Sequence, residues 1–166
     1  MYTVDDYIST IRKNLEKQND QVTANLQALF KRTFADEIDL LDFMAFIEPT
    51  RFECGISVFS MDRYANEVLS CSASAAHFYG SQEVLKDTEY FHLPDSRRDE
   101  FDQFYMENEE VIMPLELKVL TDWFQDNWER ADGRSLSLPS YFGLHDGYSS
   151  YDLKQERWID DEQKWR

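Results

Sequence analysis

Hydrophobic residues recur at helical spacing in the first part of the chain. Tyr7, Ile11 and Leu15 lie four residues apart, which places them on one face of an α-helix. The apolar period resumes at Val22 after a short polar stretch, and the first 48 residues contain neither glycine nor proline. We therefore predict one or two helices inside an N-terminal helical part that covers residues 1–37.

The periodicity changes over residues 40–72. In "FECGISVFSM", Cys54, Ile56 and Val58 alternate with less apolar neighbours, as in a strand with one buried face. The preceding "LLDFMAFIEP" has apolar residues on both parities, which suits a strand covered on both faces. The following "NEVLSC" is predicted as a third strand. The connections are too short for crossovers, so we predict a three-stranded antiparallel meander.

The two cysteines of the chain fall in this meander. If the second hairpin turns at Asp62 and Arg63, Cys54 lies directly opposite Cys71. A disulfide or a shared metal is the alternative to free thiols, but no histidine or third cysteine lies nearby in the sequence. We predict two free, buried thiols, which fit a reducing compartment.

Residues 95–132 carry the next helical pattern. Phe101, Phe104 and Tyr105 form an i, i+3, i+4 stripe within "DEFDQFYMENEE", so these rings should face the core and the surrounding carboxylates should face water. Pro114 suits the first turn of a following helix, and Gly133 suits the position just after its end. We therefore predict two helices in this region.

The pattern at the end of the chain predicts two strands around a turn. Asp146-Gly147 separates two strand-like runs and is a type I′ turn signal, which predicts a hairpin and tail over residues 138–160. The expected fold class is therefore α+β: N-terminal helices, a three-stranded antiparallel meander, two further helices and a C-terminal hairpin. The length favours a single domain over residues 1–166.

Charge narrows the range of partners. Seventeen lysines and arginines stand against 33 acids, which gives a net charge of −16. This balance disfavours direct binding to nucleic acid and to anionic membranes, and it favours a basic protein partner. Solubility alone is the alternative explanation. The N-terminus lacks the basic and apolar regions of a signal peptide, and no apolar run is long enough to span a membrane. We therefore expect a cytoplasmic protein.

Motifs for catalysis are not evident in the sequence. It has no nucleophile elbow, no glycine-rich phosphate loop and no metal-ligand spacing around His77, His92 or His145. We therefore predict no catalytic residue, metal ligand or cofactor. Carboxylate pairs are too numerous among 33 acids to single one out, so a small hydrolase with an unrecognised carboxylate site remains an alternative.

Two segments combine acids with aromatic rings, a mixture that suits binding of a basic protein. One is the 99–110 stretch, and the other surrounds Asp146-Gly147. The alternative is a solvated helix face and an ordinary hairpin. The predicted partner-binding residues are Asp99, Glu100, Asp102, Glu107, Glu109, Glu110, Tyr148, Tyr151 and Asp152.

Part of the pattern resembles a known family. "DFMAFIEPTRFECGISVFSMDRYANEVL" is similar to the strand-rich half of the small acidic immunity proteins of bacterial polymorphic-toxin systems, and "DGYSSYDL" followed by "ERWID" is similar to their tail. The resemblance includes no diagnostic motif, so it assigns no residue a role. It implies a cytosolic, non-enzymatic inhibitor of a toxin, often a basic nuclease. A DNA mimic that inhibits a nucleic-acid-binding protein is the related alternative. The sequence leaves the oligomeric state open.

Overall fold

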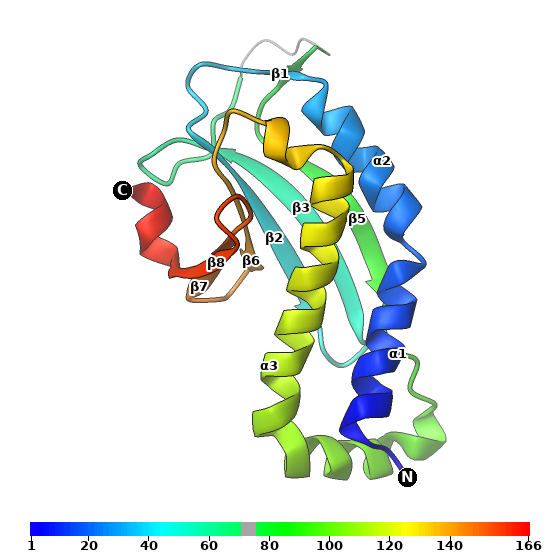
Figure 1. Ribbon diagram of the computed structural model, residues 1–166. Coiled ribbons are helices and arrows are strands. Elements are labelled where there is room, and N and C mark those ends of the chain that lie inside the picture. The colour runs from blue at the N-terminus through cyan, green and yellow to red at the C-terminus, as the bar shows by residue number, and fades with distance from the viewer. Residues whose placement is uncertain (71–75) are drawn as a thin grey trace.

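A computed structural model describes residues 1–70 and 76–166 of the chain. In this part, three α-helices lie against one face of a six-stranded sheet (Figure 1). The helices are α1 (Val4–Glu16), α2 (Asn19–Phe30) and α3 (Arg98–Arg130), with short 3₁₀ turns η1 (Asp95–Arg97), η2 (Gly133–Ser135) and η3 (Asp161–Trp165).

The large sheet has the strand order β5-β3-β2-β6-β7-β8. Its strands are β2 (Leu40–Glu48), β3 (Glu53–Met61), β5 (Ser81–Glu89), β6 (Ser140–Leu144), β7 (Ser149–Asp152) and β8 (Arg157–Asp160). Two short strands, β1 (Thr33–Phe34) and β4 (His77–Phe78), pair in parallel apart from it. The fold is therefore α+β with a mostly antiparallel sheet.

The N-terminal helices form as predicted. Tyr7, Ile11 and Leu15 are buried along α1, and Val22 begins a second buried stripe along α2. The helices cover one side of the sheet because these stripes need an apolar surface to pack against.

The predicted meander is correct for its first two strands and wrong for its third. β2 and β3 pair antiparallel, with Phe43 opposite Val58. The strand on the other side of β3 is β5, whereas of residues 66–70 only Glu67 forms a bridge, to Met61. β5 takes this place because its Val84 and Leu85 are buried, so the later segment contributes the apolar face that the sheet requires.

The residues opposite Cys54 on the neighbouring strands are not the predicted Cys71. Cys54 lies opposite Thr88 of β5, while Cys71 falls outside the described residues. Cys54 itself is free and buried, as predicted. Its burial raises the pKa of the thiol to about 12, so the nucleophilic thiolate form is disfavoured at neutral pH.

The two helices predicted for residues 95–132 are a single helix. α3 continues through Pro114, which has no N–H to donate and whose ring crowds the carbonyl of Glu110. Such positions bend a helix without always ending it, and Figure 1 shows α3 changing direction in its first half before it runs along the sheet.

The end of α3 also differs from the prediction. Asp132, with a φ of 68°, takes the left-handed position expected for Gly133. Gly133 is needed for a different reason, because a Cβ at this position would overlap the buried indole of Trp128.

β6 adds to the sheet in a way that the sequence did not indicate. It pairs in parallel with β2, with Phe142 opposite Phe43, because α3 supplies the long crossover that a parallel pair requires. The predicted hairpin follows as β6 and β7. Its turn is not type I′, since neither Asp146 nor Gly147 has a positive φ. No helix in the described residues is both long and apolar enough to cross a membrane.

Candidate functional site

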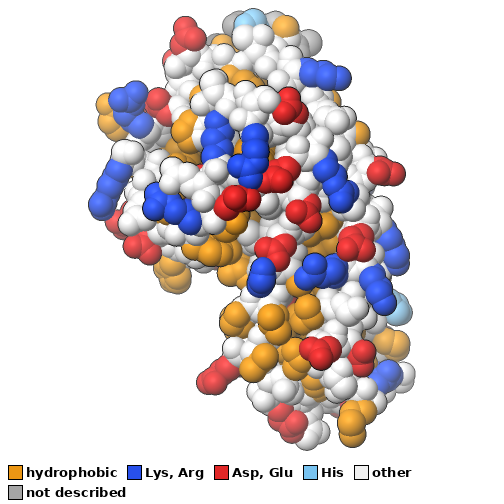
Figure 2. Space-filling view, viewed as in Figure 1, with side chains coloured by type: hydrophobic (Ala, Val, Ile, Leu, Met, Phe, Trp, Pro, Cys, Tyr) orange, Lys and Arg blue, Asp and Glu red, His pale blue; other side chains and the backbone are white. Residues whose placement is uncertain are grey.

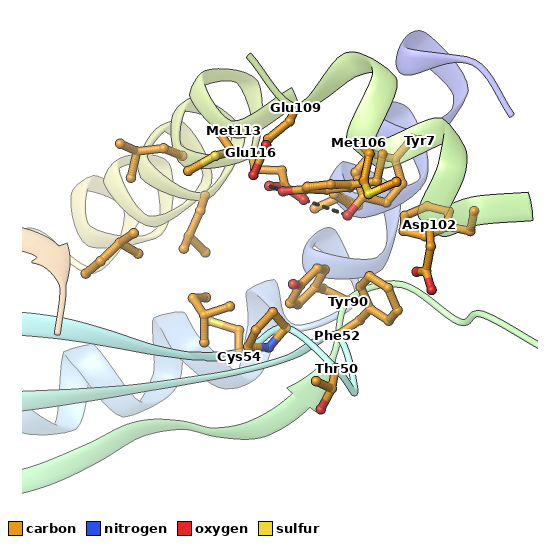
Figure 3. A pocket seen from close by; sticks show the side chains of 18 of the residues that line it. Tyr7, Thr50, Phe52, Cys54, Tyr90, Asp102, Met106, Glu109, Met113 and Glu116 are labelled. Carbon is orange, nitrogen blue, oxygen red and sulfur yellow. Dashed lines mark hydrogen bonds between the residues drawn. The ribbon is translucent and has the colours of Figure 1, made fainter. Parts of the chain in front are cut away.

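A cleft of about 750 Å³ lies between α1, the part of α3 from Arg98 to Leu120 and the turn that joins β2 to β3. Figure 3 shows Met106, Met113 and Glu116 on one wall, and Thr50, Phe52 and Cys54 on the other. The lining residues are Tyr7, Ile11, Leu15, Ile47, Pro49, Thr50, Phe52, Cys54, Tyr90, Arg98, Phe101, Asp102, Tyr105, Met106, Glu109, Met113, Glu116, Leu117, Leu120 and Leu144.

The α3 wall of the cleft follows from helical spacing. Asp102, Met106, Glu109 and Met113 are three or four residues apart and all line the cleft, because residues at this spacing share one face of a helix. The cleft therefore runs along α3 rather than crossing it.

Phe52 shapes the opposite wall from a strained backbone. Its φ is 53°, which is a rare conformation for a bulky residue. Its backbone oxygen accepts a hydrogen bond from the Tyr90 N–H at 2.8 Å, and its ring meets Phe101 edge-on with 5.4 Å between centroids. The packed rings hold this turn in place.

Glu116 is the most unusual group in the cleft. Its Oε1 accepts a hydrogen bond from the Tyr7 hydroxyl at 2.6 Å, and its Oε2 accepts one from the Tyr105 hydroxyl at 2.8 Å (Figure 3). Burial raises the pKa of the Glu116 carboxyl above its ordinary value, although both hydrogen bonds oppose the rise. Burial beside the same carboxylate raises the pKa of Tyr7 and Tyr105. The cleft thus holds a carboxylate in a mainly apolar setting.

The raised pKa makes the stability of the fold depend on Glu116. The folded state holds the Glu116 proton more tightly than the unfolded chain, where the pKa is about 4.3. The contribution of this proton to stability is therefore present below that value and is lost as the pH rises through the folded pKa. We expect Glu116→Gln to become more stable relative to the wild type as the pH rises from about 4 to about 8. Urea denaturation across this range measures the difference.

Glu110→Gln provides the control, because Glu110 is exposed on the same helix and does not line the cleft. Its stability should follow that of the wild type at every pH. Parallel curves for Glu116→Gln and the wild type would contradict the assignment of a raised pKa to Glu116.

The six predicted acids of α3 are all exposed. Glu100 pairs with Arg97 at 3.1 Å and with the N-terminal amine at 3.2 Å. Within the described residues, none of the other five acids forms an ion pair. Asp102 and Glu109 line the cleft, so part of the predicted acidic surface forms its rim. Of the three rings predicted to be buried, Phe101 is buried, whereas Phe104 and Tyr105 are only partly so.

Apolar side chains are exposed beside these acids. Met106, Val111 and Met113 are 73%, 55% and 54% exposed, respectively. Figure 2 shows hydrophobic and acidic side chains side by side over the lower part of the molecule. Sequence reasoning missed this mixture, because it treated the segment as having one apolar face and one charged face.

The hairpin residues do not form a single surface. Tyr148 is 93% exposed. The Tyr151 ring packs edge-on against Trp158 with 5.3 Å between centroids. Asp152 is buried, and its Oδ1 accepts hydrogen bonds from the N–H groups of Lys154 and Gln155, both at 3.0 Å. Of these three, Tyr148 alone offers its side chain fully to a partner.

The charged groups that influence Tyr151 include Asp122 and Lys118, which lie in the second half of α3, whereas the predicted acids lie in the first half. Leu144, at the end of β6, lines the cleft together with Asp102 and Glu109. The base of the hairpin and part of the predicted acidic surface therefore adjoin the same cleft.

A second buried charge cluster lies outside the cleft. Lys164 Nζ lies 2.6 Å from Asp42 Oδ2 and 2.7 Å from Asp161 Oδ1, and Ser150 donates a hydrogen bond to Asp161 at 2.7 Å. Burial raises the pKa of Asp42, opposed by the charge of Lys164. Both side chains of the Lys164–Asp42 pair are almost fully buried, so the cluster joins η3 to the sheet rather than facing a ligand.

The central acids of the two clusters, Glu116 and Asp42, each had a weak signal in the sequence. Asp42 interrupts the apolar run "LLDFMAFI", and Glu116 interrupts "MPLEL". An acid inside an apolar segment indicates a buried carboxylate that needs hydrogen-bond partners. Tyr7, the partner of Glu116, and Lys164, the partner of Asp42, are each more than 100 positions away from the acid in sequence. The sequence pattern therefore did not identify these partners.

Within the described residues, no group of three or more histidine, cysteine, aspartate and glutamate side chains is arranged to hold a metal ion. No family model matches the chain, and no curated protein or solved structure is significantly similar to it. A function for this chain therefore has to be inferred from the geometry of the cleft and of α3.

Proposed function

We propose that this chain is a non-enzymatic binding protein that inhibits a basic protein partner by covering its active site with the first half of α3. The observation that carries the proposal is the set of five exposed acids without an ion pair in the described residues, interleaved with exposed Met106 and Met113. Carboxylates attract lysine and arginine, and flexible methionines adapt to an apolar surface.

The arrangement of these groups along α3 supports a binding role. Asp102, Met106, Glu109 and Met113 follow one helix face, so a partner that lies along this face meets acids and apolar groups in alternation. A face that served only solubility would have no need of exposed methionines at these positions. Net charge of −16 adds long-range attraction for a basic partner.

The proposal extends to the setting in which the protein acts. By analogy with the immunity proteins that the sequence resembles, we propose that the inhibitor works in the cytosol of the bacterium that makes the toxin. Its target would be a basic toxin domain. A neighbouring gene for a large secreted protein with a basic C-terminal domain would support this setting.

Charge steering leads to a kinetic prediction. The triple variant Glu107→Gln, Glu109→Gln and Glu110→Gln should associate with the partner about tenfold more slowly at low salt, because the acids speed the encounter. The dissociation rate should change less, since packed side chains hold the complex once it has formed. The partner is obtained by pull-down from the source cell, and stopped-flow mixing over a range of salt concentrations gives both rates.

A matched triple variant separates steering by α3 from the effect of net charge. Glu16, Glu37 and Glu83 are exposed and lie outside α3, so changing all three to glutamine removes the same charge elsewhere. This control should slow association much less than the α3 triple variant. Equal association rates for the wild type and the α3 triple variant would overturn the proposal and leave α3 as a solvated helix face.

A further inference from the structure

The cleft beside α3 has the size of a small-molecule site. Its volume of about 750 Å³ lies within the range of 300–1,000 Å³ that is typical of ligand pockets. A single lysine or arginine side chain from a protein partner would fill only a small part of such a volume. The dimensions therefore favour a free organic molecule.

The walls of the cleft favour a ligand with a large apolar part. Most lining residues are aliphatic or aromatic, and rings from Tyr7, Phe52, Tyr90, Phe101 and Tyr105 come from four different parts of the chain. Aromatic rings present a negative face, which attracts an organic cation more than an anion.

The charged groups of the cleft point to the same class of ligand. Among the described lining residues, the acids are Asp102, Glu109 and Glu116, and the base is Arg98. Arg98 donates a long hydrogen bond of 3.5 Å to the backbone oxygen of Thr50. The surplus of carboxylates therefore favours a positively charged ligand.

Glu116 is placed to receive such a charge. Each of its carboxylate oxygens accepts one tyrosine hydrogen bond, and a carboxylate oxygen has room for a second interaction. The two hydroxyls also hold the carboxylate in a fixed orientation. A cation beside it would restore the charge compensation that water supplies to an exposed carboxylate.

We propose that the cleft binds a small organic cation with an extended apolar body, with its positive end at Glu116 and its apolar part between the α3 and Phe52 walls. This site goes beyond the proposed inhibition of a protein partner. It shares Met106, Glu109 and Met113 with the α3 face proposed for that partner, but the group that receives the ligand's charge is the half-buried Glu116.

Three probes with the same apolar chain test the charge preference. These are octyltrimethylammonium, octanesulfonate and octanol, each titrated into the full chain by calorimetry below the concentration at which the probe forms micelles. We expect the ammonium to bind at least about tenfold more tightly than the alcohol, and the sulfonate to bind most weakly. Equal affinities for the three probes would overturn the proposal, because the cleft would then recognise only the apolar chain.

Glu116→Gln tests the role of the carboxylate. We expect this variant to bind the ammonium about tenfold more weakly while its affinity for octanol stays the same. Glu83→Gln is the matched control, because it removes one charge from an exposed position on β5 outside the cleft. An equal loss of ammonium affinity in both variants would show a general charge effect and would exclude Glu116 as the binding group.

Methyl resonances of methionine locate the bound probe. Met106 and Met113 line the cleft, whereas Met44 and Met61 lie on β2 and β3 outside it. NMR spectra of protein with labelled methionine methyl groups should therefore show shifts for Met106 and Met113 on addition of the ammonium. Shifts confined to Met44 or Met61 would place the probe elsewhere and overturn the assignment. The double variant Glu107→Gln with Glu110→Gln separates the two proposals, because neither residue lines the cleft. Loss of partner binding in this variant with these shifts intact would show that the two sites act independently.

Discussion

Replacing Lys164 with methionine is expected to destabilise the fold by about 3–5 kcal/mol, because it leaves the buried Asp42 carboxylate without its cation. Lys164 and Asp42 are only 2% and 1% exposed at their side chains and lie 2.6 Å apart. Asp161 also loses its ion pair with Lys164, but its side chain is 39% exposed, so water can solvate its carboxylate more easily than that of Asp42. Urea denaturation followed by circular dichroism measures the change in the free energy of unfolding.

The double variant Asp42→Leu with Lys164→Met tests the reason for this loss. Removing both charges eliminates the uncompensated carboxylate, so the double variant should recover much of the stability. Lys118→Met is the matched control, because Lys118 forms an exposed ion pair with Asp122 at 2.6 Å and its loss should cost less than about 1 kcal/mol. A double variant as unstable as the single one would show that packing by Lys164, rather than charge compensation, stabilises this region.

Phe101→Ala is expected to cost about 3–5 kcal/mol of folding stability, as is usual when a buried aromatic side chain is truncated. Phe101 is 2% exposed, and its ring packs against Tyr2, Tyr7 and Phe91 with 5.1–5.3 Å between centroids. These contacts join α1 and the segment after β5 to the first half of α3. The loss should therefore also loosen the cleft that these elements line.

Two variants on the same helix show whether burial sets the cost. Met106→Ala removes a side chain that is 73% exposed and should change stability by less than about 0.5 kcal/mol. Phe104→Ala should fall between the two, because its ring is partly buried. Chemical denaturation of the three variants gives the order. A cost for Phe101→Ala no larger than that for Met106→Ala would contradict the packing described for α3.

Local patterns in the sequence were sufficient for several elements. The four-residue spacing of Tyr7, Ile11 and Leu15 predicted α1, and alternation around Ile56 predicted β3, because each pattern depends only on neighbours within a few residues. The same reasoning correctly predicted that the acids of α3 face water. It did not predict that Met106 and Met113 are exposed beside them, because an apolar residue can lie at the surface without breaking a helical pattern.

Only the tertiary structure decided which segment pairs with β3 and whether a new helix begins at Pro114. Residues 66–71 were predicted as the third strand next to β3, yet β5 takes this place because it buries Val84 and Leu85 under the helices. Pro114 was predicted to begin a new helix, yet α3 continues through it. Propensity is a weak guide in such cases, because packing against distant elements outweighs it.

The sequence by itself determined the fold class, the N-terminal helices, the β2–β3 hairpin, the C-terminal hairpin and the acidic character of α3. Only the tertiary structure decided that Glu116 meets Tyr7, that Lys164 meets Asp42, and that β6 lies parallel to β2. The physical reason is the range of the interactions. Helical and strand periodicity arise from neighbours along the chain, whereas a buried carboxylate takes its partners from whichever residues the packed fold brings within hydrogen-bonding distance.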